Sequence, residues 1–261
     1  MAHSKKRLRD DLLRLGVRPG DALLMHSSFK SLGGIEDGAA GFYDVLLDLL
    51  GGAGTMVVPT LSYRDVTRET PDFDARTTPS CVGYLTEYFR TRVPDVRRSL
   101  HATHSCCAWG RCRDEMVAGH ELDATPVGSH SPFRKLPEAG GKILILGSHP
   151  DHNTSMHGVE ETVSPMRFID FDHMLIYRIA DMAGRVIQRP SWRHRFERPN
   201  GVYRQCYARI LNLLDDGEAR RGRVLDADCW LLDAGAVWKK GHEKMLEDPF
   251  FFVEWTPNGA L

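Results

Sequence analysis

The stretch "NTSMHGVEE", residues 153–161, brings together side chains that can move a proton. His157 and Glu160 are three residues apart, and residues at that spacing share one face of a helix. A carboxylate beside an imidazole orients the ring, which suits a general base near neutral pH. The stretch contains no HExxH pattern, so the signature of a zinc protease is missing. The alternative is a capped helix whose glutamates are solvated.

A second polar stretch, "MHSSFKSLGG", follows an apolar run that begins at Ala22. It places His26, Ser27 and Ser28 at the end of a predicted strand, where α/β folds bind ligands. Exposed backbone N–H groups in such a loop can hold a phosphate or an oxyanion. The alternative is a polar strand end that only turns into the next element.

A third stretch, "RSLHATHSCCAWG", contains His101, His104 and Ser105. A histidine with a serine suggests a hydrolase triad, but the chain has no GxSxG elbow. The two histidines could also bind a metal, yet no matching pair of ligands stands out nearby, and we expect no metal. For one of the two, a hydrogen-bonded structural histidine fits well.

Strands that end side by side, with helices between them, are needed to bring these groups together. Periodicity and turn residues predict both kinds of element. Buried strands are expected at 22–29, 54–61 and 142–147, another strand at 105–110, and strands around a turn at 183–184. Helices are expected at 4–16, 38–51, 81–92, 110–122, 131–141, 202–217 and 233–247, with one more beginning after an N-cap among Asn153, Thr154 and Ser155. This alternation predicts a layered α/β sandwich with a central mixed sheet, and we expect residues 1–261 to form a single domain. The polar segment 62–79 is expected to be a long functional excursion.

The composition excludes several classes of protein. The chain has 261 residues, of which 42% are hydrophobic and 26% charged, and its formal net charge of −1 gives no overall basic field for nucleic acid. It shows neither the apolar core of a signal peptide nor a run of roughly 20 apolar residues that could cross a membrane. We therefore expect a cytoplasmic protein. The six cysteines form no CxxC pair and are expected to be reduced.

Four stretches, taken in order, resemble the aminoglycoside 3-N-acetyltransferase family, the antibiotic N-acetyltransferases that use acetyl-CoA. They are "LLMHSSFKSLGG" with "GGAGTMVVPTLSY", then "FDARTTPSCVGYLTEYFRTRVPDVRRSLHATHSCCAWG", then "TPVGSHSPFRKLPEAGGKILILG", and finally "NTSMHGVEE". Together they cover most of residues 20–165, and the similarity fades beyond about residue 170.

The resemblance implies direct transfer of an acetyl group from CoA to an amine, in an antibiotic N-acetyltransferase-like fold. It places His157 at the family's functional histidine with Glu160 as its partner, and His26 at the histidine of the first loop. It makes Ser27, Ser28, Phe29 and Ser105 the expected contacts for CoA. Acetyl-CoA is the implied cosubstrate, and no metal belongs to the chemistry. A homodimer is the assembly considered.

Two departures affect the expected acceptor. "HAT" at residues 101–103 stands where relatives commonly show His-Pro. The segment "RVIQRPSWRHRFERPNGVYR" carries many cations and one acid, and it would repel a polycationic aminoglycoside if it faced the cleft. For the structure of this segment, the alternative is a solvated arginine-rich hairpin. For the function, the alternatives are an acceptor that is a neutral or anionic amine in a biosynthetic pathway, and a non-catalytic relative that binds CoA.

Overall fold

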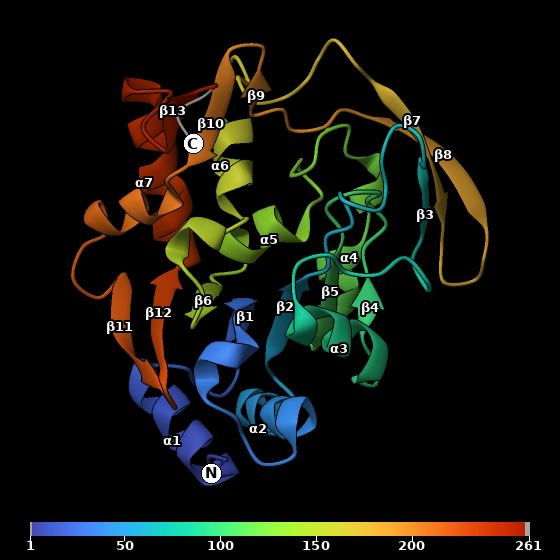
Figure 1. Cartoon of the computed structure of the whole chain (residues 1–261). Coiled ribbons are helices and arrows are strands. Elements are labelled where there is room, and N and C mark those ends of the chain that lie inside the picture. Colours follow the sequence, from blue (N-terminus) through green and yellow to red (C-terminus); the bar gives the residue numbers. More distant parts are fainter. Residues whose placement is uncertain (1, 259–261) are drawn as a thin grey trace.

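A computed structural model describes residues 2–258 and shows a seven-stranded mixed sheet with helices on both faces (Figure 1). The strand order is β11-β12-β6-β1-β2-β5-β4. In this sheet β6, β1 and β2 are parallel, whereas β12 and β5 run antiparallel to the strands they flank. The bounds are β1 (Ala22–Ser27), β2 (Thr55–Pro59), β4 (Arg97–Arg98), β5 (Cys106–Gly110), β6 (Lys142–Leu146), β11 (Ala219–Val224) and β12 (Ala227–Asp233). The predicted α/β fold with a central mixed sheet is confirmed.

Two hydrophobic cores lie on opposite faces of this sheet, because successive side chains of a strand point to opposite sides. In β1, Leu23 and Met25 belong to one core and Leu24 to the other. Helices α1 (Lys5–Leu15), α2 (Gly38–Leu50) and α3 (Tyr84–Arg92) cover the first. Helices α4 (Arg113–Val117), α5 (Pro132–Glu138), α6 (Met156–Glu161) and α7 (Ala234–Glu247) cover the second.

The longer helices begin and end where the sequence predicts. The side chain of Ser4 accepts a hydrogen bond from the N–H of Arg7 at the start of α1. Gly16, with φ 117°, ends that helix in a conformation that favours glycine. Asp233 caps α7 by accepting from the N–H of Ala236.

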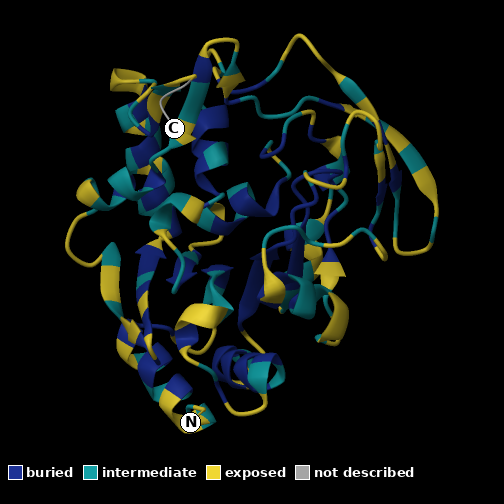
Figure 2. Cartoon of the chain, in the orientation of Figure 1, coloured by how far each residue is buried: buried dark blue, intermediate teal, exposed yellow. Residues whose placement is uncertain are grey.

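Two smaller sheets flank the central one. The first contains β3 (Asp72–Asp74), β7 (Leu175–Ala180) and β8 (Val186–Ser191), and its β7–β8 hairpin projects away from the central sheet with many exposed residues (Figures 1 and 2). The second contains β9 (Glu197–Arg198), β10 (Gly201–Gln205) and β13 (Val253–Pro257). The predicted strands around residues 183–184 are confirmed as β7 and β8.

A buried cation contributes to the attachment of the long segment 62–79 to the central sheet. The guanidinium of Arg98 donates to the carbonyls of Thr60 and Thr78 and to Ser105 Oγ. It also lies 4.6 Å from the ring centre of Phe73 in β3. Arg98 therefore helps to hold the segment that forms a wall of the site described below.

Two predictions of helical structure need correction, and a third is confirmed in position. Residues 202–217 form β10 followed by a 3₁₀ helix, η4 (Tyr207–Asn212), because Val202 and Tyr203 pair with β13 in an extended conformation. The helix expected at 110–122 ends at Val117, and Gly119, with φ 75°, separates it from the short η2 (His120–Leu122). Helix α6 begins after Ser155, one of the three expected N-cap residues, and the Ser155 hydroxyl donates to the Asn153 side chain rather than making a capping bond.

In the described part of the chain, no helix combines the length and the apolar character needed to cross a membrane. All six cysteines are free, as expected. The arrangement in a single domain stays a prediction.

Candidate active site

A cavity of about 780 Å³, here called the main cavity, lies at the edge where β1, β2 and β6 end. A second hollow of about 600 Å³, the side cavity, adjoins it and shares Ser27, Val82, Ser148 and His152 with it. A third hollow of about 900 Å³ between α1 and β11 contains none of the predicted site residues. The main cavity therefore lies beyond the carboxyl ends of parallel strands, where open α/β sheets generally bind ligands.

The sheet brings the first set of side chains to the main cavity. His26 and Ser27 end β1, and the loop after β6 carries Ser148 and leads into η3 (Pro150–His152) and α6. Since β5 is antiparallel to β2 with Cys106 opposite Pro59, the residues just before β5 reach the same edge. His104 therefore lies on the cavity wall.

His157 and Glu160 make the contact that their spacing predicts. The distance from His157 Nδ1 to Glu160 Oε2 is 3.1 Å, and Glu160 is almost completely buried. Tyr207, at the start of η4, joins them. Its hydroxyl lies 2.8 Å from His157 Nδ1 and donates to Glu160 Oε2 over 3.0 Å. Burial and the neighbouring Glu160 hold the pKa of Tyr207 well above its usual range, so its hydroxyl keeps its proton.

These contacts determine which nitrogen of His157 is free. The Glu160 carboxylate can only accept, and the Tyr207 proton is already donated to it. The proton on Nδ1 of His157 therefore lies between the two oxygens. The Nε2 atom then carries a lone pair, and the ring lines the main cavity. This is the arrangement that a general base requires.

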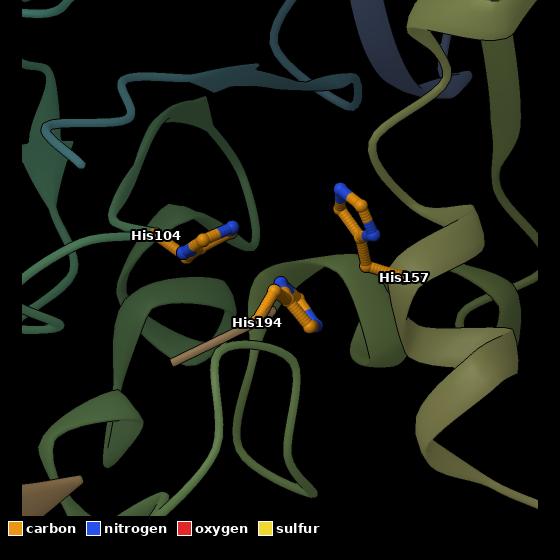
Figure 3. Close-up of side chains that lie close together, drawn as sticks. All are labelled: His104, His157 and His194. Atoms are coloured by element: carbon orange, nitrogen blue, oxygen red, sulfur yellow. The ribbon is translucent and has the colours of Figure 1, made fainter. Parts of the chain in front are cut away.

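Two more imidazoles pack against His157, as Figure 3 shows. The rings of His157 and His194 stack with centres 4.3 Å apart, and the ring of His104 lies edge-on to both. His194 Nε2 lies 2.8 Å from Oε1 of Glu161, which also accepts the N–H of Val127. We call His104, His157 and His194 the histidine cluster. It thus places two histidine–glutamate pairs side by side.

Burial determines the charge of several of these groups. It lowers the pKa of His104 and His194 well below the usual value, and it lowers the pKa of His26 to about 3, so these rings are neutral. Burial raises the pKa of Glu161 to about 7. Neutral imidazoles do not repel a positive charge in the main cavity.

The structure brings some of the predicted CoA contacts together and separates one. Ser27 lines both cavities, whereas Ser28 and Phe29 line the side cavity. The N–H of Ser28 is occupied by the carbonyl of Leu146, so it is not the free donor expected there. Ser105 lines neither cavity: it is completely buried, and its hydroxyl donates to the Thr60 carbonyl. A CoA contact is therefore no longer proposed for Ser105.

His101 is the structural histidine of its pair. It is buried, and its Nδ1 accepts from the backbone N–H groups of Thr103 and His104. This turn orients His104, whose own Nδ1 lies 2.9 Å from the Thr103 hydroxyl. Among the described residues, the group of candidate metal ligands that contains His104 does not include His101.

The arginine-rich segment mostly faces away from the main cavity. Arg185 pairs with Asp181, Arg195 with Asp170, and Arg198 donates to backbone carbonyls. From this segment, the cations of the main cavity wall are reduced to Arg193, whose guanidinium donates to the carbonyls of Tyr63 and Val66. The expected repulsion of a polycation is therefore much weaker than the sequence suggests.

Tyr207, His194 and Glu161 are site residues that sequence reasoning missed. Tyr207 was placed in a helix, and His194 was read as one more cation among arginines. Both lie far along the chain from His157, and only the fold joins them to it. The signal that could have found Glu161 was its neighbour Glu160, since the two adjacent carboxylates each serve a different histidine.

The fold is similar to that of solved aminoglycoside acetyltransferases. The solved structure of AAC-IIIb in a binary complex with CoASH superposes with a TM-score of 0.81, at 27% identity, over 95% of this chain and 97% of that one. The structure of aminoglycoside acetyltransferase AAC(3)-IVa, a histidine-to-alanine variant bound to gentamicin, gives 0.80 at 26% identity over 97% and 92%.

The sequence identifies the family. The model of the family described as aminoglycoside 3-N-acetyltransferase matches residues 24–246, so the chain belongs to that family, and it is an acyltransferase. Aminoglycoside N(3)-acetyltransferase IV of Salmonella sp is 37% identical over 158 residues, which are 60% of this chain and 58% of that relative. The recognition made from four short stretches is confirmed.

Proposed function

We propose that this protein transfers the acetyl group of acetyl-CoA directly to an amine of an aminoglycoside, at the 3-N position, with His157 as the general base. The observation that carries the proposal is the His157 ring on the wall of the main cavity, with its Nδ1 occupied by Glu160 and Tyr207. A protonated amine is not a nucleophile, and a base must remove its proton before or during attack.

In the proposed reaction, the amine nitrogen bonds to the acetyl carbon and the carbon–sulfur bond of the thioester breaks. His157 Nε2 takes the amine proton and can return it to the CoA sulfur. Glu160 stabilises the imidazolium that forms in between. His26 and Ser27 are proposed to stabilise the thioester oxygen, because each has a buried polar atom without a partner, His26 Nε2 and Ser27 Oγ.

The two cavities suggest where each substrate binds. We propose that the pantetheine arm of CoA lies in the side cavity beside Ser27, Ser28 and Phe29, and that the acceptor lies in the main cavity. The shared wall then brings the thioester next to His157. A relative solved with CoASH and another solved with gentamicin support a two-substrate site of this kind.

A second acceptor class has one observation in its favour. Arg64 and Arg193 line the main cavity together with Asp151 and Glu197, so the wall has as many cations as anions. Asp151 is also partly occupied, because it accepts the N–H of Ala208. A neutral or anionic amine is the alternative acceptor.

An assay of thiol release separates these proposals. The protein is incubated with acetyl-CoA and a panel containing gentamicin, sisomicin, a neutral amino sugar and an amine that carries a phosphate. We expect release of CoA with the aminoglycosides. Release only with the phosphate-bearing amine would replace the aminoglycoside by the anionic acceptor. No calorimetric binding of acetyl-CoA or CoA would overturn the enzyme proposal itself.

A further inference from the structure

We propose that the histidine cluster of His104, His157 and His194 binds a divalent transition-metal ion such as Zn²⁺, and that the bound ion inhibits acetyl transfer. The site itself depends only on the geometry of the cluster. The inhibition rests on the proposed function, in which His157 is the base.

The first argument is the convergence of the ligand atoms. Each of the three histidines offers one ring nitrogen, and these nitrogens lie within 4.8 Å of one another. Within residues 2–258, no other group of three or more histidine, cysteine or acidic side chains meets this condition. The residues come from three separate segments, the turn before β5, helix α6 and the loop before β9, and Figure 3 shows the rings gathered around a common space.

The second argument is that each ring has one nitrogen held by a neighbour. Nδ1 of His104 is bonded to Thr103, and Nδ1 of His157 to Glu160 and Tyr207. Nε2 of His194 is bonded to Glu161. Metal-binding histidines commonly hold the ring nitrogen that is not coordinated in this way, often with a carboxylate. The opposite nitrogens are left for a ligand.

The third argument is an unpartnered atom. The side chain of His194 is only 8% exposed, and its buried Nδ1 has no hydrogen-bond partner. Buried polar atoms are nearly always paired, and an exception calls for a physical reason. A metal ion bound to this nitrogen supplies one.

The donor set selects the kind of ion. Three imidazoles suit Zn²⁺, Cu²⁺, Ni²⁺ or Co²⁺, whereas Mg²⁺ and Ca²⁺ prefer oxygen ligands. The glutamates beside the cluster face the outer nitrogens of His157 and His194 and are already bonded there. The fourth position of a tetrahedral ion would open into the main cavity, where water can occupy it.

Binding requires a small rearrangement. Zn–N bonds of about 2.0–2.1 Å place tetrahedral nitrogens about 3.4 Å apart, and the present nitrogens lie within 4.8 Å of one another. The ion must also lie in the plane of each ring, while the rings of His157 and His194 are now stacked at 30°. We expect small rotations of the rings to meet both conditions, and the main cavity borders the cluster at His104, His157 and His194.

Inhibition follows from the chemistry of one atom. Nε2 of His157 cannot coordinate an ion and accept a proton with the same lone pair. An ion in the cluster would therefore occupy the lone pair that the proposed base needs. The metal is not a cofactor in this proposal, and a metal-free protein is expected to be fully active.

The test titrates metal-free, full-length protein with Co²⁺ and records its visible absorption, with Zn²⁺ as the competitor. We expect one equivalent of Co²⁺ to give the intense bands of a tetrahedral site, and Zn²⁺ to remove them. His104→Gln and His194→Gln should each abolish the bands. Glu161→Gln, which can still accept the Val127 N–H, should weaken binding about 10- to 100-fold. His130→Gln is the matched control, a histidine paired with Asp123 outside the cluster, and should bind normally.

Each outcome decides a different part. No tetrahedral bands in the wild type, or equal bands in the wild type and in both cluster variants, overturns the site. Thermal unfolding identifies a variant that has failed to fold, and the second cluster variant then decides. Tetrahedral binding with no loss of thiol release overturns the inhibition. If no amine in the panel is acetylated, the proposed function fails while the absorption result stands independently.

Discussion

At the scale of single residues, the free nitrogen of His157 is determined by two oxygens rather than one. Glu160 and Tyr207 both contact the opposite nitrogen, and the tyrosine hydroxyl also donates to the carboxylate. Such a closed set of hydrogen bonds fixes both the ring orientation and its tautomer. Substitutions of His157, Glu160 and Tyr207 should therefore lower the rate of acetyl transfer by different amounts, with the largest loss at His157.

Replacing His157 should have the largest effect. We expect His157→Ala to lower the rate of acetyl transfer about 10²- to 10⁴-fold, the usual cost of losing a general base. Binding of acetyl-CoA, measured by calorimetry, should stay nearly unchanged, because the proposed CoA contacts lie in the side cavity. Glu160→Gln should cost less, since the imidazole remains. A His157→Ala protein that keeps more than roughly a tenth of the rate would make His157 structural and His26 the better base.

Tyr207→Phe tests the second oxygen. It removes a hydroxyl that bonds to both His157 and Glu160 and leaves the ring in place. Hydrogen bonds to charged groups contribute about 1.5–3 kcal/mol, so we expect kcat to fall by about one to two orders of magnitude with little change in KM. Steady-state kinetics with both substrates provide the measurement. An equal fall for Tyr203→Phe, a tyrosine outside the cavity, would show a general loss of structure instead.

The sequence predicts part of this residue-scale chemistry. His157 and Glu160 are close because of local helical spacing, and only two positions separate them in the sequence. Tyr207 and His194 contact the His157 ring only through tertiary packing, since they lie 50 and 37 residues beyond it in the sequence. No local pattern predicts such contacts. His194 also lies among arginines in the sequence, which favours its interpretation as one more surface cation.

At the scale of elements, the position of His157 depends on how α6 packs against α7. Gly158 follows His157 directly, and a Cβ atom there would come within 2.2 Å of the Trp238 ring in α7 and 2.6 Å of Val127. Glycine is thus required for the close approach of the two helices. The packing of α6 against α7 therefore also sets the position of the proposed base, His157.

Gly158→Ala should therefore affect both stability and activity. Overpacking of a well-packed core typically costs about 1–3 kcal/mol, and we expect the free energy of unfolding in urea to fall by that amount. The rate should also fall, because α6 must shift and carries His157 with it. Gly52→Ala is the control, since a Cβ atom at Gly52 meets nothing within 4 Å. Wild-type stability and rate in Gly158→Ala would contradict this role of the helix contact.

The elements themselves were predicted well where the pattern is local and poorly where it is not. Helix α1 and strand β6 show clear periodicity and terminal signals. Residues 202–217 have a mixture of apolar and polar residues that also fits a helix, but pairing with β13 makes them extended first. Strands β11 and β12 were missed, because "ARRGRV" carries the charges of an edge strand rather than a buried one.

At the scale of the whole molecule, the described chain keeps five buried histidines neutral. Burial lowers the pKa of His26 and His101 to about 3, and that of the other three well below the usual value. These other three are His104, His120 and His194. Between the folded and unfolded pKa values, the unfolded chain binds more protons than the folded one. The free energy of unfolding must therefore fall as the pH falls below about 6.5.

The melting temperature should consequently drop between pH 8 and pH 5. Each such histidine contributes about 1.4 kcal/mol per pH unit within its window. Glu161 acts in the opposite direction, since its raised pKa of about 7 favours the folded state as pH falls toward 4.5, but it is one group against five. Calorimetric scans over this range make the measurement. His101→Asn should give a shallower acid limb, and His149→Gln, an exposed histidine, should not. A melting temperature unchanged at pH 5 would contradict the argument.

The order of strands in the central sheet has a consequence for synthesis on the ribosome. Strand β6 pairs with β1 on one side and with β12 on the other, yet β12 lies near the end of the chain. At about 5–20 residues per second, β6 waits for several seconds with one edge open while the intervening chain emerges. Helix α1 precedes β11 by most of the central sheet, so it must likewise wait for β11 to complete its packing. Nascent chains of this protein should therefore be most prone to pair with one another just before residues 219–233 emerge, and a chaperone that binds unpaired strands has most to protect in that interval.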